Sequence, residues 1–226
     1  MRIITGIYKG RRFDIPRSFK ARPTTDFAKE NIFNVLNSYI DLEGVRALDL
    51  FAGTGSISLE LLSRGCSQVV SVEADRDHAR FIGECVRKLG VTNHQLIRGD
   101  VFRYLKSAQK SSTLTRGSAA LPLEHSDAVA IERGSAALNA AQQHLNRGEA
   151  AIEHPDRGRA FSFIFADPPY ALPNLPDIPD LVLQSGILAP GGVFVFEHGK
   201  QNDFSSHPCF REHRAYGSVN FTIFTT

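Results

Sequence analysis

The sequence predicts an α/β fold: a doubly wound, mostly parallel sheet with an antiparallel C-terminal hairpin and a short N-terminal β-hairpin and helix. Three observations predict it. Short apolar runs bounded by turn residues are typical of strands buried on both faces. Helical stretches alternate with these runs, which indicates parallel strands joined by crossover helices. Near the C-terminus two runs flank a Gly-Ser turn, which indicates an antiparallel hairpin.

The N-terminal extension combines the predicted hairpin with the predicted helix. Isoleucines and aromatic residues surround Gly6 and Gly10, and Pro16 closes the stretch. From Thr25 to Tyr39 the apolar positions fall near helical spacing, and residues 24–26 offer helix caps. We assign residues 1–40 to this extension and residues 41–226 to the main domain.

The main domain contains the sheet. Strands are predicted at 45–51, 68–73, 94–97, 161–166 and 192–197, helices at 57–63 and 77–89, and the closing hairpin at 212–216 and 219–224. Residues 106–160 break this pattern, because they are rich in Ala, Ser, Arg and Gly and contain the string RGSAAL twice. We interpret them as an insertion, disordered or partly helical, without a function of its own; a lid or substrate clamp is the alternative.

Composition excludes several classes of protein. Of the 226 residues, 42% are hydrophobic and 22% charged, unlike disordered, collagen-like or coiled-coil chains. No apolar run reaches the roughly 20 residues of a membrane span, and the N-terminus lacks a secretory signal. Three distant cysteines without a Cys-x-x-Cys pair, and histidines without ligand spacing, predict neither disulfides nor a metal site. We expect a cytoplasmic protein without membrane attachment or metal.

The positive charge is concentrated at the N-terminus. Residues 1–29 hold eight Lys or Arg against two Asp, a net charge of +6, within a chain whose total is +2. A basic arm on a mildly acidic body favours a polyanionic partner, because cationic side chains bind nucleic acid through its phosphates. A merely solvated N-terminal surface is the alternative.

A glycine loop follows the first predicted strand. The sequence DLFAGTG, residues 49–55, stands at the carboxyl edge of the sheet, where open α/β folds bind ligands. Its glycines let the backbone approach a ligand and leave the next helix N-terminus facing it. The dinucleotide fingerprint would need a glycine where Ser58 stands, and Asp49 would repel a pyrophosphate but attract an ammonium. The loop therefore favours S-adenosylmethionine over a nicotinamide dinucleotide.

Acidic residues end the next two strands. Glu73 ends the second, where it can accept hydrogen bonds from ribose hydroxyls; Asp75 competes with it, and we interpret Asp75 as solvated. Asp100 ends the third, where its carboxylate can bind the adenine amine while Val101 and Phe102 pack the ring. Each acid alone has the alternative role of a helix cap. Together, at the ends of successive strands, they indicate a bound nucleoside.

The most specific motif, Asp167-Pro168-Pro169-Tyr170, follows the fourth strand. Its prolines fix the backbone and remove two N–H donors, so the outward groups are mainly acceptors: the Asp167 carboxylate and the Pro168 carbonyl. Such acceptors suit an exocyclic amine. By holding the hydrogens of the amine, they favour the tetrahedral nitrogen whose lone pair attacks a methyl group. Tyr170 offers a ring face on which an extruded base can stack. A plain Pro-Pro turn is the alternative interpretation.

These motifs resemble those of known families. The DPPY motif resembles that of amino methyltransferases acting on adenine N6 or guanine N2. The segments RIITGIYKGR, RPTTD, DLFAGTG and EADR, which begin at residues 2, 22, 49 and 73, are similar to the bacterial 16S rRNA guanine-N2 methyltransferase family. The likeness covers nearly the whole chain except residues 106–160. It implies a Rossmann-like methyltransferase sheet, S-adenosylmethionine as cofactor, and as substrate 16S rRNA within a 30S subunit or an assembly intermediate.

The resemblance also implies roles for matching residues, in a protein that we expect to be a monomer. Cofactor contacts are expected from Thr24, Thr25, Asp49, Phe51, Ala52, Gly53, Thr54, Gly55, Glu73, Ala74, Asp100 and Val101. The guanine would be received by the catalytic residues Asp167, Pro168, Pro169 and Tyr170. The rRNA would be bound by Arg2, Lys9, Arg11, Arg12 and Arg22.

Two alternative functions stay open. An adenine-N6 methyltransferase on DNA or RNA would use the same motif, and a non-catalytic RNA-binding protein could retain the cofactor fold. His198, at the end of the fifth strand, is a candidate general base. The methylated amine is acidic enough to lose its proton to water or to Asp167, so we interpret His198 as structural or solvated.

Overall fold

The computed structural model describes residues 1–19, 25–116 and 160–226. Its centre is a seven-stranded sheet in the order β3-β2-β1-β4-β5-β7-β6. The strands are β1 (Arg46–Leu50), β2 (Gln68–Glu73), β3 (His94–Arg98), β4 (Phe161–Ala166), β5 (Leu188–His198), β6 (Phe210–Tyr216) and β7 (Val219–Thr225). Strands β1 to β5 pair in parallel, whereas β7 pairs antiparallel with both β5 and β6. The predicted fold class is confirmed.

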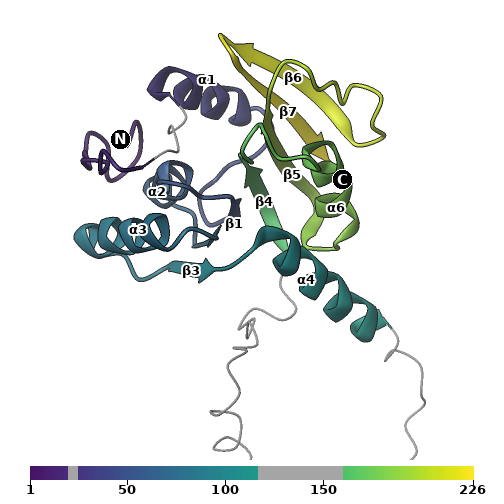
Figure 1. Ribbon diagram of the computed structural model, residues 1–226, viewed down its shortest axis with the longest axis horizontal. Helices are drawn as coiled ribbons and strands as arrows, with labels where there is room; N and C mark the ends of the chain where they lie inside the picture. The colour runs from purple at the N-terminus through teal and green to yellow at the C-terminus, as the bar shows by residue number, and fades with distance from the viewer. Residues whose placement is uncertain (20–24, 117–159) are drawn as a thin grey trace, which may run out of the picture.

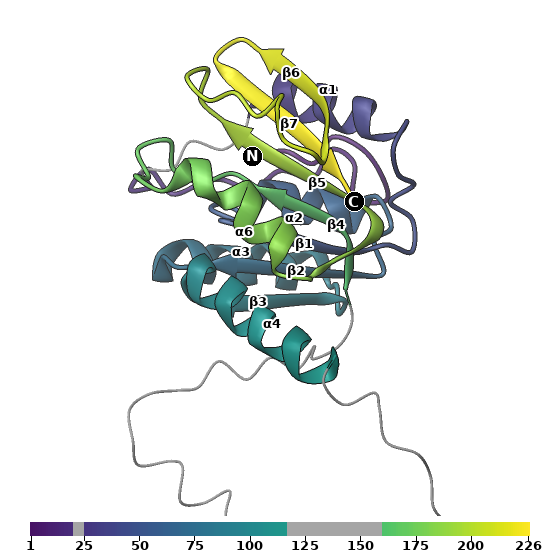
Figure 2. The ribbon, with the colours of Figure 1, turned by 90° about the vertical axis from the view of Figure 1, so that its right-hand side faces the viewer.

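Helices cover both faces of this sheet (Figures 1 and 2). One face carries α1 (Asp26–Leu36), α2 (Ser56–Ser63) and α3 (Arg76–Leu89); the other carries α4 (Val101–Arg116) and α6 (Ile178–Gln184), with a short 3-10 turn (Leu175–Asp177) before α6. Strand side chains alternate between two apolar clusters, as a period of two requires. Phe163 and Phe165 belong to the α1 side, and Ile164 to the α4 side.

Most predicted bounds agree with the structure, although β5 begins at Leu188 rather than at residue 192. Two helices differ from the prediction. Helix α4 continues to Arg116, so the first part of the predicted insertion is the end of a helix whose Tyr104 and Leu105 pack on the sheet. The rest of the insertion, 117–159, lies outside the described residues. Helix α6 was not predicted, because Pro173 and Pro176 precede it and Pro179 lies in its first turn, and prolines at this density are typical of loops. None of the described helices is long and apolar enough to cross a membrane.

The strand order reverses between β1 and β4. From β1 the chain builds outward through β2 to β3, and then returns to β4 on the other side of β1. The last residues of these two strands, Leu50 and Ala166, are register partners. In open α/β sheets, ligands bind outside the carboxyl ends of the strands at such a reversal. The glycine loop after β1 and the Asp-Pro-Pro-Tyr turn after β4 both begin at this point.

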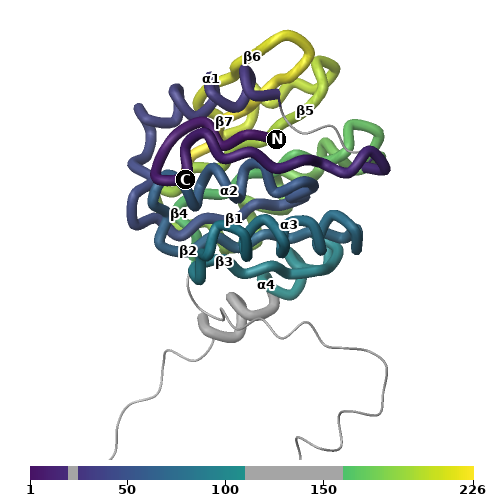
Figure 3. The backbone as a smooth tube through the Cα atoms, turned by 90° about the vertical axis from the view of Figure 1, so that its left-hand side faces the viewer, coloured from purple at the N-terminus to yellow at the C-terminus, as the bar shows by residue number. Residues whose placement is uncertain are grey.

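Residues 1–19 lie along the outer side of α2 (Figure 3). The predicted hairpin is reduced to one antiparallel bridge, between Arg2 and Arg12. Ile3 and Phe13 are buried in the apolar cluster on the α1 side. Gly6 has a φ of 87°, and a Cβ there would lie 1.8 Å from the carbonyl oxygen of Ser63, so the close approach requires glycine. The N-terminal segment is therefore packed against the main domain.

Candidate active site

The loop after β1 is folded tightly by positive backbone angles. Gly53 and Gly55 have φ values of 54° and 74°, and Phe51, which is not glycine, has a φ of 61°. A Cβ on Gly55 would lie 3.0 Å from Ile82 of α3, so this glycine also permits close packing. Ala52 and Thr54 are buried within the loop. A positive φ at Phe51 is uncommon for a bulky residue, and such positions cluster at functional sites.

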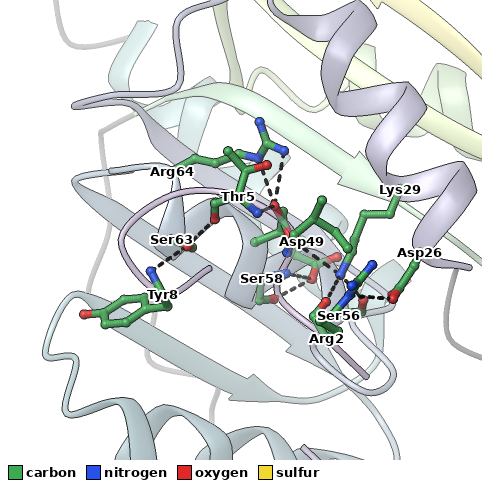
Figure 4. A network of polar contacts seen from close by, with 12 residues as sticks. Arg2, Thr5, Tyr8, Asp26, Lys29, Asp49, Ser56, Ser58, Ser63 and Arg64 are labelled. Carbon is green, nitrogen blue, oxygen red and sulfur yellow. Dashed lines mark hydrogen bonds and ion pairs between the residues drawn. The ribbon is translucent and has the colours of Figure 1, made fainter. Parts of the chain in front are cut away.

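Asp49 lies buried beneath this loop. Its side chain is held by Ser58, whose backbone N–H donates to Oδ2 at 3.0 Å and whose hydroxyl donates to the same oxygen; Figure 4 shows the two residues side by side. Ser58 Oγ lies 2.6 Å from Ser71 Oγ, which lies 2.8 Å from His94 Nε2. Burial raises the pKa of Asp49 to about 7, and the charges of Asp167 and Glu73 add to the rise. The carboxylates at the ends of β1, β2 and β4 are thus near enough to interact.

Glu73 connects the ends of β1 and β2. Its Oε2 accepts the Gly53 N–H at 2.6 Å, and its Oε1 accepts the Asp75 N–H at 2.7 Å. Each carboxylate oxygen has a second acceptor position, so the expected contact with ribose hydroxyls stays compatible with these bonds. Asp75, the competing residue, caps α3 by accepting from the backbone N–H of Asp77 and His78, which lowers its pKa. Ala74 is exposed between Glu73 and Asp75.

Asp100 caps the helix that follows β3. It is exposed, and its Oδ1 accepts the Arg103 N–H at 2.9 Å in the first turn of α4. Val101 is only 3% exposed and packs in the core, so its contact with an adenine stays a prediction. Phe102 is half-buried, and its ring centroid lies 6.2 Å from that of Phe51. Phe51 and Phe102 are the aromatic rings that this edge presents beside Asp100.

The Asp-Pro-Pro-Tyr turn is joined directly to the end of β1. The Asp167 N–H donates to the Leu50 carbonyl at 3.4 Å, which brings the turn beside the glycine loop. Pro168 is buried and Pro169 is exposed. The Tyr170 hydroxyl donates to Glu197 at 3.1 Å, while 41% of the residue is exposed. Partial burial, together with the charges of Glu197 and Asp167, raises the pKa of Tyr170.

Sequence reasoning missed Glu197 as the partner of Tyr170. Glu197 is the last residue but one of β5, and Glu73 is the last residue of β2, so an acid closing an apolar run was the available signal. His198, the next residue, is completely buried, with Nδ1 2.9 Å from the Gly199 carbonyl and Nε2 2.8 Å from the Thr222 hydroxyl. Burial lowers its pKa. These contacts support a structural rather than a catalytic histidine.

Those remaining predicted residues that the structure describes lie on the α1 side of the sheet. Thr25 caps α1 by accepting the Ala28 N–H at 3.2 Å, whereas Thr24 and Arg22 lie outside the described residues. Lys9, Arg11 and Arg12 are exposed on the N-terminal segment. The Arg11 guanidinium donates to the Lys88 carbonyl at 3.2 Å, and Arg2 pairs with Asp26 at 3.0 Å. Within the described ranges, no group of three or more His, Cys, Asp or Glu could hold a metal ion.

Known proteins are similar to this chain in sequence and in fold. The family model described as conserved hypothetical protein 95 matches residues 1–116 and 113–225. YlbH of Bacillus subtilis, named provisionally as an rRNA methyltransferase, is 41% identical over 118 residues, which cover 52% of this chain and 63% of that protein. Ribosomal RNA small subunit methyltransferase D of Escherichia coli K12 is 34% identical over 112 residues, 50% of this chain and 54% of that protein. The chain therefore spans about half to two thirds of these two relatives.

A solved structure agrees over the full length. A hypothetical protein of Thermus thermophilus has a TM-score of 0.69 and 26% identity, covering 100% of this chain and 99% of that one. The resemblance to rRNA methyltransferases noted in the sequence is thus confirmed at the level of the family. This chain is similar to proteins that are named as rRNA methyltransferases. Because the family model matches nearly every residue, the chain belongs to the family of conserved hypothetical protein 95.

Proposed function

We propose that this protein transfers a methyl group from S-adenosylmethionine to the exocyclic N2 amine of a guanine in small-subunit rRNA. The observation that carries the proposal is the hydrogen bond from the Asp167 N–H to the Leu50 carbonyl. It sets an acceptor-rich turn beside a glycine loop, at the reversal point of the sheet. A methyl donor and an amine acceptor bound at these two places would meet.

The cofactor is expected along the carboxyl ends of β1, β2 and β3. S-adenosylmethionine carries a sulfonium and an ammonium, and both positive groups are favoured near the carboxylates of Asp49 and Glu73. The same carboxylates would repel the pyrophosphate of a dinucleotide. Glu73 would hold the ribose, and Phe51 and Phe102 offer apolar surface for the adenine beside Asp100.

The methyl transfer needs orientation more than a strong base. The Asp167 carboxylate and the Pro168 carbonyl would each accept one hydrogen of the amine, which frees its lone pair for in-line attack on the sulfonium methyl. A nitrogen–carbon bond forms, the carbon–sulfur bond breaks, and its electron pair stays on sulfur. The ammonium that results then loses a proton to water or to Asp167. Positioning of this kind contributes about 7–11 kcal/mol in well-oriented reactions.

Tyr170 is suited to hold the target base. Its hydroxyl is fixed by Glu197, so the orientation of the ring is set before substrate arrives. Base stacking on an aromatic ring contributes about 1–3 kcal/mol per base. The names of the relatives support rRNA as the substrate, and the exposed cations on the N-terminal segment support a phosphate-rich partner.

The experiment supplies labelled S-adenosylmethionine with three acceptors: 30S subunits lacking N2-methylguanosine, naked 16S rRNA and duplex DNA. Nucleoside analysis of the product is expected to give N2-methylguanosine in rRNA. Asp167→Asn is expected to bind the cofactor as wild type does and to lose turnover by a factor of at least about 100. N6-methyladenosine as product would show that the acceptor is the N6 amine of adenine and would contradict the proposed guanine N2. Cofactor binding without transfer to any acceptor would favour a non-catalytic RNA-binding protein.

A further inference from the structure

An aromatic ring outside the apolar core is exposed at the start of α1. Phe27 is 66% exposed, whereas Ile32, Phe33 and Leu36 of the same helix are at most 1% exposed. At 100° per residue, Phe27 lies on the side of the helix opposite that buried face. The core therefore does not require an aromatic residue at this position.

A series of ring contacts connects Phe27 with the strand that leads to the Asp-Pro-Pro-Tyr turn. The Phe27 ring meets the Tyr216 ring edge to face, with centroids 6.1 Å apart and an interplanar angle of 89°. Tyr216, at the end of β6, lies 6.1 Å from Phe221, which lies 6.2 Å from Phe165 of β4. Phe27 and Tyr216 form the outer end of this series, and we call these two residues the aromatic step.

The aromatic step and Tyr170 lie at the same edge of the sheet and on the same face. Phe221 is the register partner of Glu197, and residues directly opposite each other in an antiparallel pair project to the same face. Glu197 accepts the Tyr170 hydroxyl, and Phe221 contacts Tyr216. Strands β5 and β6 are separated only by β7, so the backbone of β6 runs roughly 10 Å, or two strand spacings, from that of β5.

We propose that the aromatic step stacks an unpaired base next to the target nucleotide of the RNA substrate. This inference rests on the proposed function, and it describes how the RNA substrate would be held at a second nucleotide beside the active site. When a target base is extruded, the adjacent bases lose their stacking contact with it. A second aromatic ring of the protein can stack on one of these adjacent bases and replace the lost contact.

The surroundings favour a nucleic acid over an apolar protein surface. Arg214 stands two residues before Tyr216 on β6, so both side chains project to the same face. Its side chain is 47% exposed, and its guanidinium pairs with Glu212. Arg2 and Asp26 form an exposed ion pair beside Phe27. Single aromatic rings flanked by cationic groups are the arrangement by which proteins bind single-stranded nucleic acid, with stacking for the bases and charge for the phosphates.

Substitutions of Phe27 test the step through kinetics. Phe27→Ala and Phe27→Leu are expected to raise the KM for the RNA acceptor about tenfold, which is the effect of one lost base-stacking contact. The value of kcat and the affinity for the cofactor are expected to stay unchanged. Phe27→Tyr, which keeps a ring, is the matched control and should behave as wild type. An unchanged KM in Phe27→Ala would overturn the proposal, and a normal KM in Phe27→Leu alone would replace stacking by simple apolar contact.

A second measurement does not depend on catalysis. The chain contains no tryptophan, so Phe27→Trp introduces a single tryptophan at the aromatic step, whose emission is excited separately from that of the five tyrosines. Single-stranded RNA is expected to quench its emission, and a duplex of the same sequence to quench it several-fold less. Equal or absent quenching by both RNAs would overturn the step. Quenching without any methyl transfer would preserve the step and contradict the proposed function, whereas transfer without quenching or a KM effect would do the reverse.

Discussion

Asp49 and Glu60 are two buried carboxylates, 2% and 0% exposed, that meet the same helix α2 in very different surroundings. Glu60 lies 3.5 Å from the Lys29 ammonium and 3.2 Å from the Arg64 guanidinium, and it accepts the backbone N–H of Ile4 and Thr5. Asp49 accepts only neutral donors from Ser58, and its charged neighbours Asp167 and Glu73 are acidic.

The difference teaches which carboxylate serves the structure and which serves a ligand. A buried charge is costly unless it is paired and hydrogen-bonded, and Glu60 meets both conditions within the chain. In the part of the chain that the structure describes, no ion pair neutralises Asp49. Groups perturbed by burial and like charges cluster at functional sites. We therefore interpret Glu60 as the joint between the N-terminal segment and α2, and Asp49 as a partner for an external cation.

The largest effect is expected from breaking the joint. Lys29 is 1% exposed and also donates to the Arg2 carbonyl at 2.6 Å and to the Ser56 hydroxyl at 3.2 Å. Burial lowers its pKa, although the charge of Glu60 opposes the change. Lys29→Met should lower the free energy of unfolding by about 3–5 kcal/mol, because Glu60 loses one of its two cations. Urea unfolding measures the change.

A double variant separates charge from packing at this joint. Lys29→Met combined with Glu60→Gln removes both charges and should recover part of the stability lost in Lys29→Met, since the uncompensated carboxylate is gone. The double-mutant cycle then gives the coupling between the two residues. A single variant that costs less than about 1 kcal/mol would show that this pair behaves as a surface ion pair does.

The next effect concerns ligand affinity at Asp49. Asp49→Asn should weaken S-adenosylmethionine about 10- to 100-fold, which corresponds to the loss of one charge-assisted hydrogen bond to the ammonium. Stability should change little or rise, because a buried carboxylate is replaced by a neutral amide. Calorimetric titration measures the affinity. Methylthioadenosine, which lacks the amino-acid part, is the control, and an equal loss for both ligands would contradict the assignment.

A smaller effect is expected from pH. The folded-state pKa of Asp49 is about 7 against an ordinary 3.8, so the folded protein retains this proton between these values. The contribution of Asp49 to stability is therefore present at low pH and is lost as the pH rises through about 7. Ligand affinity changes with pH in the opposite direction and rises as the pH rises, because only the ionised carboxylate of Asp49 attracts an ammonium.

Affinity for S-adenosylmethionine should consequently rise about fivefold between pH 6 and pH 7. Measurements end there because the amino group of the ligand begins to lose its own proton near pH 7.7–8.0, to judge from roughly that pKa for α-amino groups. Asp49→Asn should flatten the profile. A slope that persists in this variant would assign the proton to another group.

The sheet was predictable from the sequence because its evidence is local. Runs such as FSFIFA and QVVSVE each predict a buried strand without reference to the rest of the chain. The glycine loop and the Asp-Pro-Pro-Tyr turn directly follow such runs. The strand ends therefore indicated Asp49, Glu73, Asp100 and Asp167 as candidate site residues before any packing was known.

What the sequence did not reveal depends on residues that are distant along the chain. Lys29 and Glu60 are 31 residues apart, and Tyr170 and Glu197 are 27 apart, so no local pattern links either pair. Ser58 entered the sequence argument only as a missing glycine, since its bond to Asp49 exists only after the loop has folded. The elevated pKa of Asp49 likewise follows from burial, which packing decides.

The smallest effect is expected from the surface pair beside the joint. Arg2 and Asp26 are paired at 3.0 Å but their side chains are 43% and 45% exposed, and such pairs contribute about 0–1 kcal/mol. Lys29 binds the backbone carbonyl of Arg2, which Arg2→Ala retains. This variant should therefore lower the free energy of unfolding by less than about 1 kcal/mol and reduce the salt dependence of RNA binding by about one phosphate contact. A loss of stability as large as that of Lys29→Met would mean that the Arg2 side chain, and not its carbonyl, holds the N-terminal segment in place.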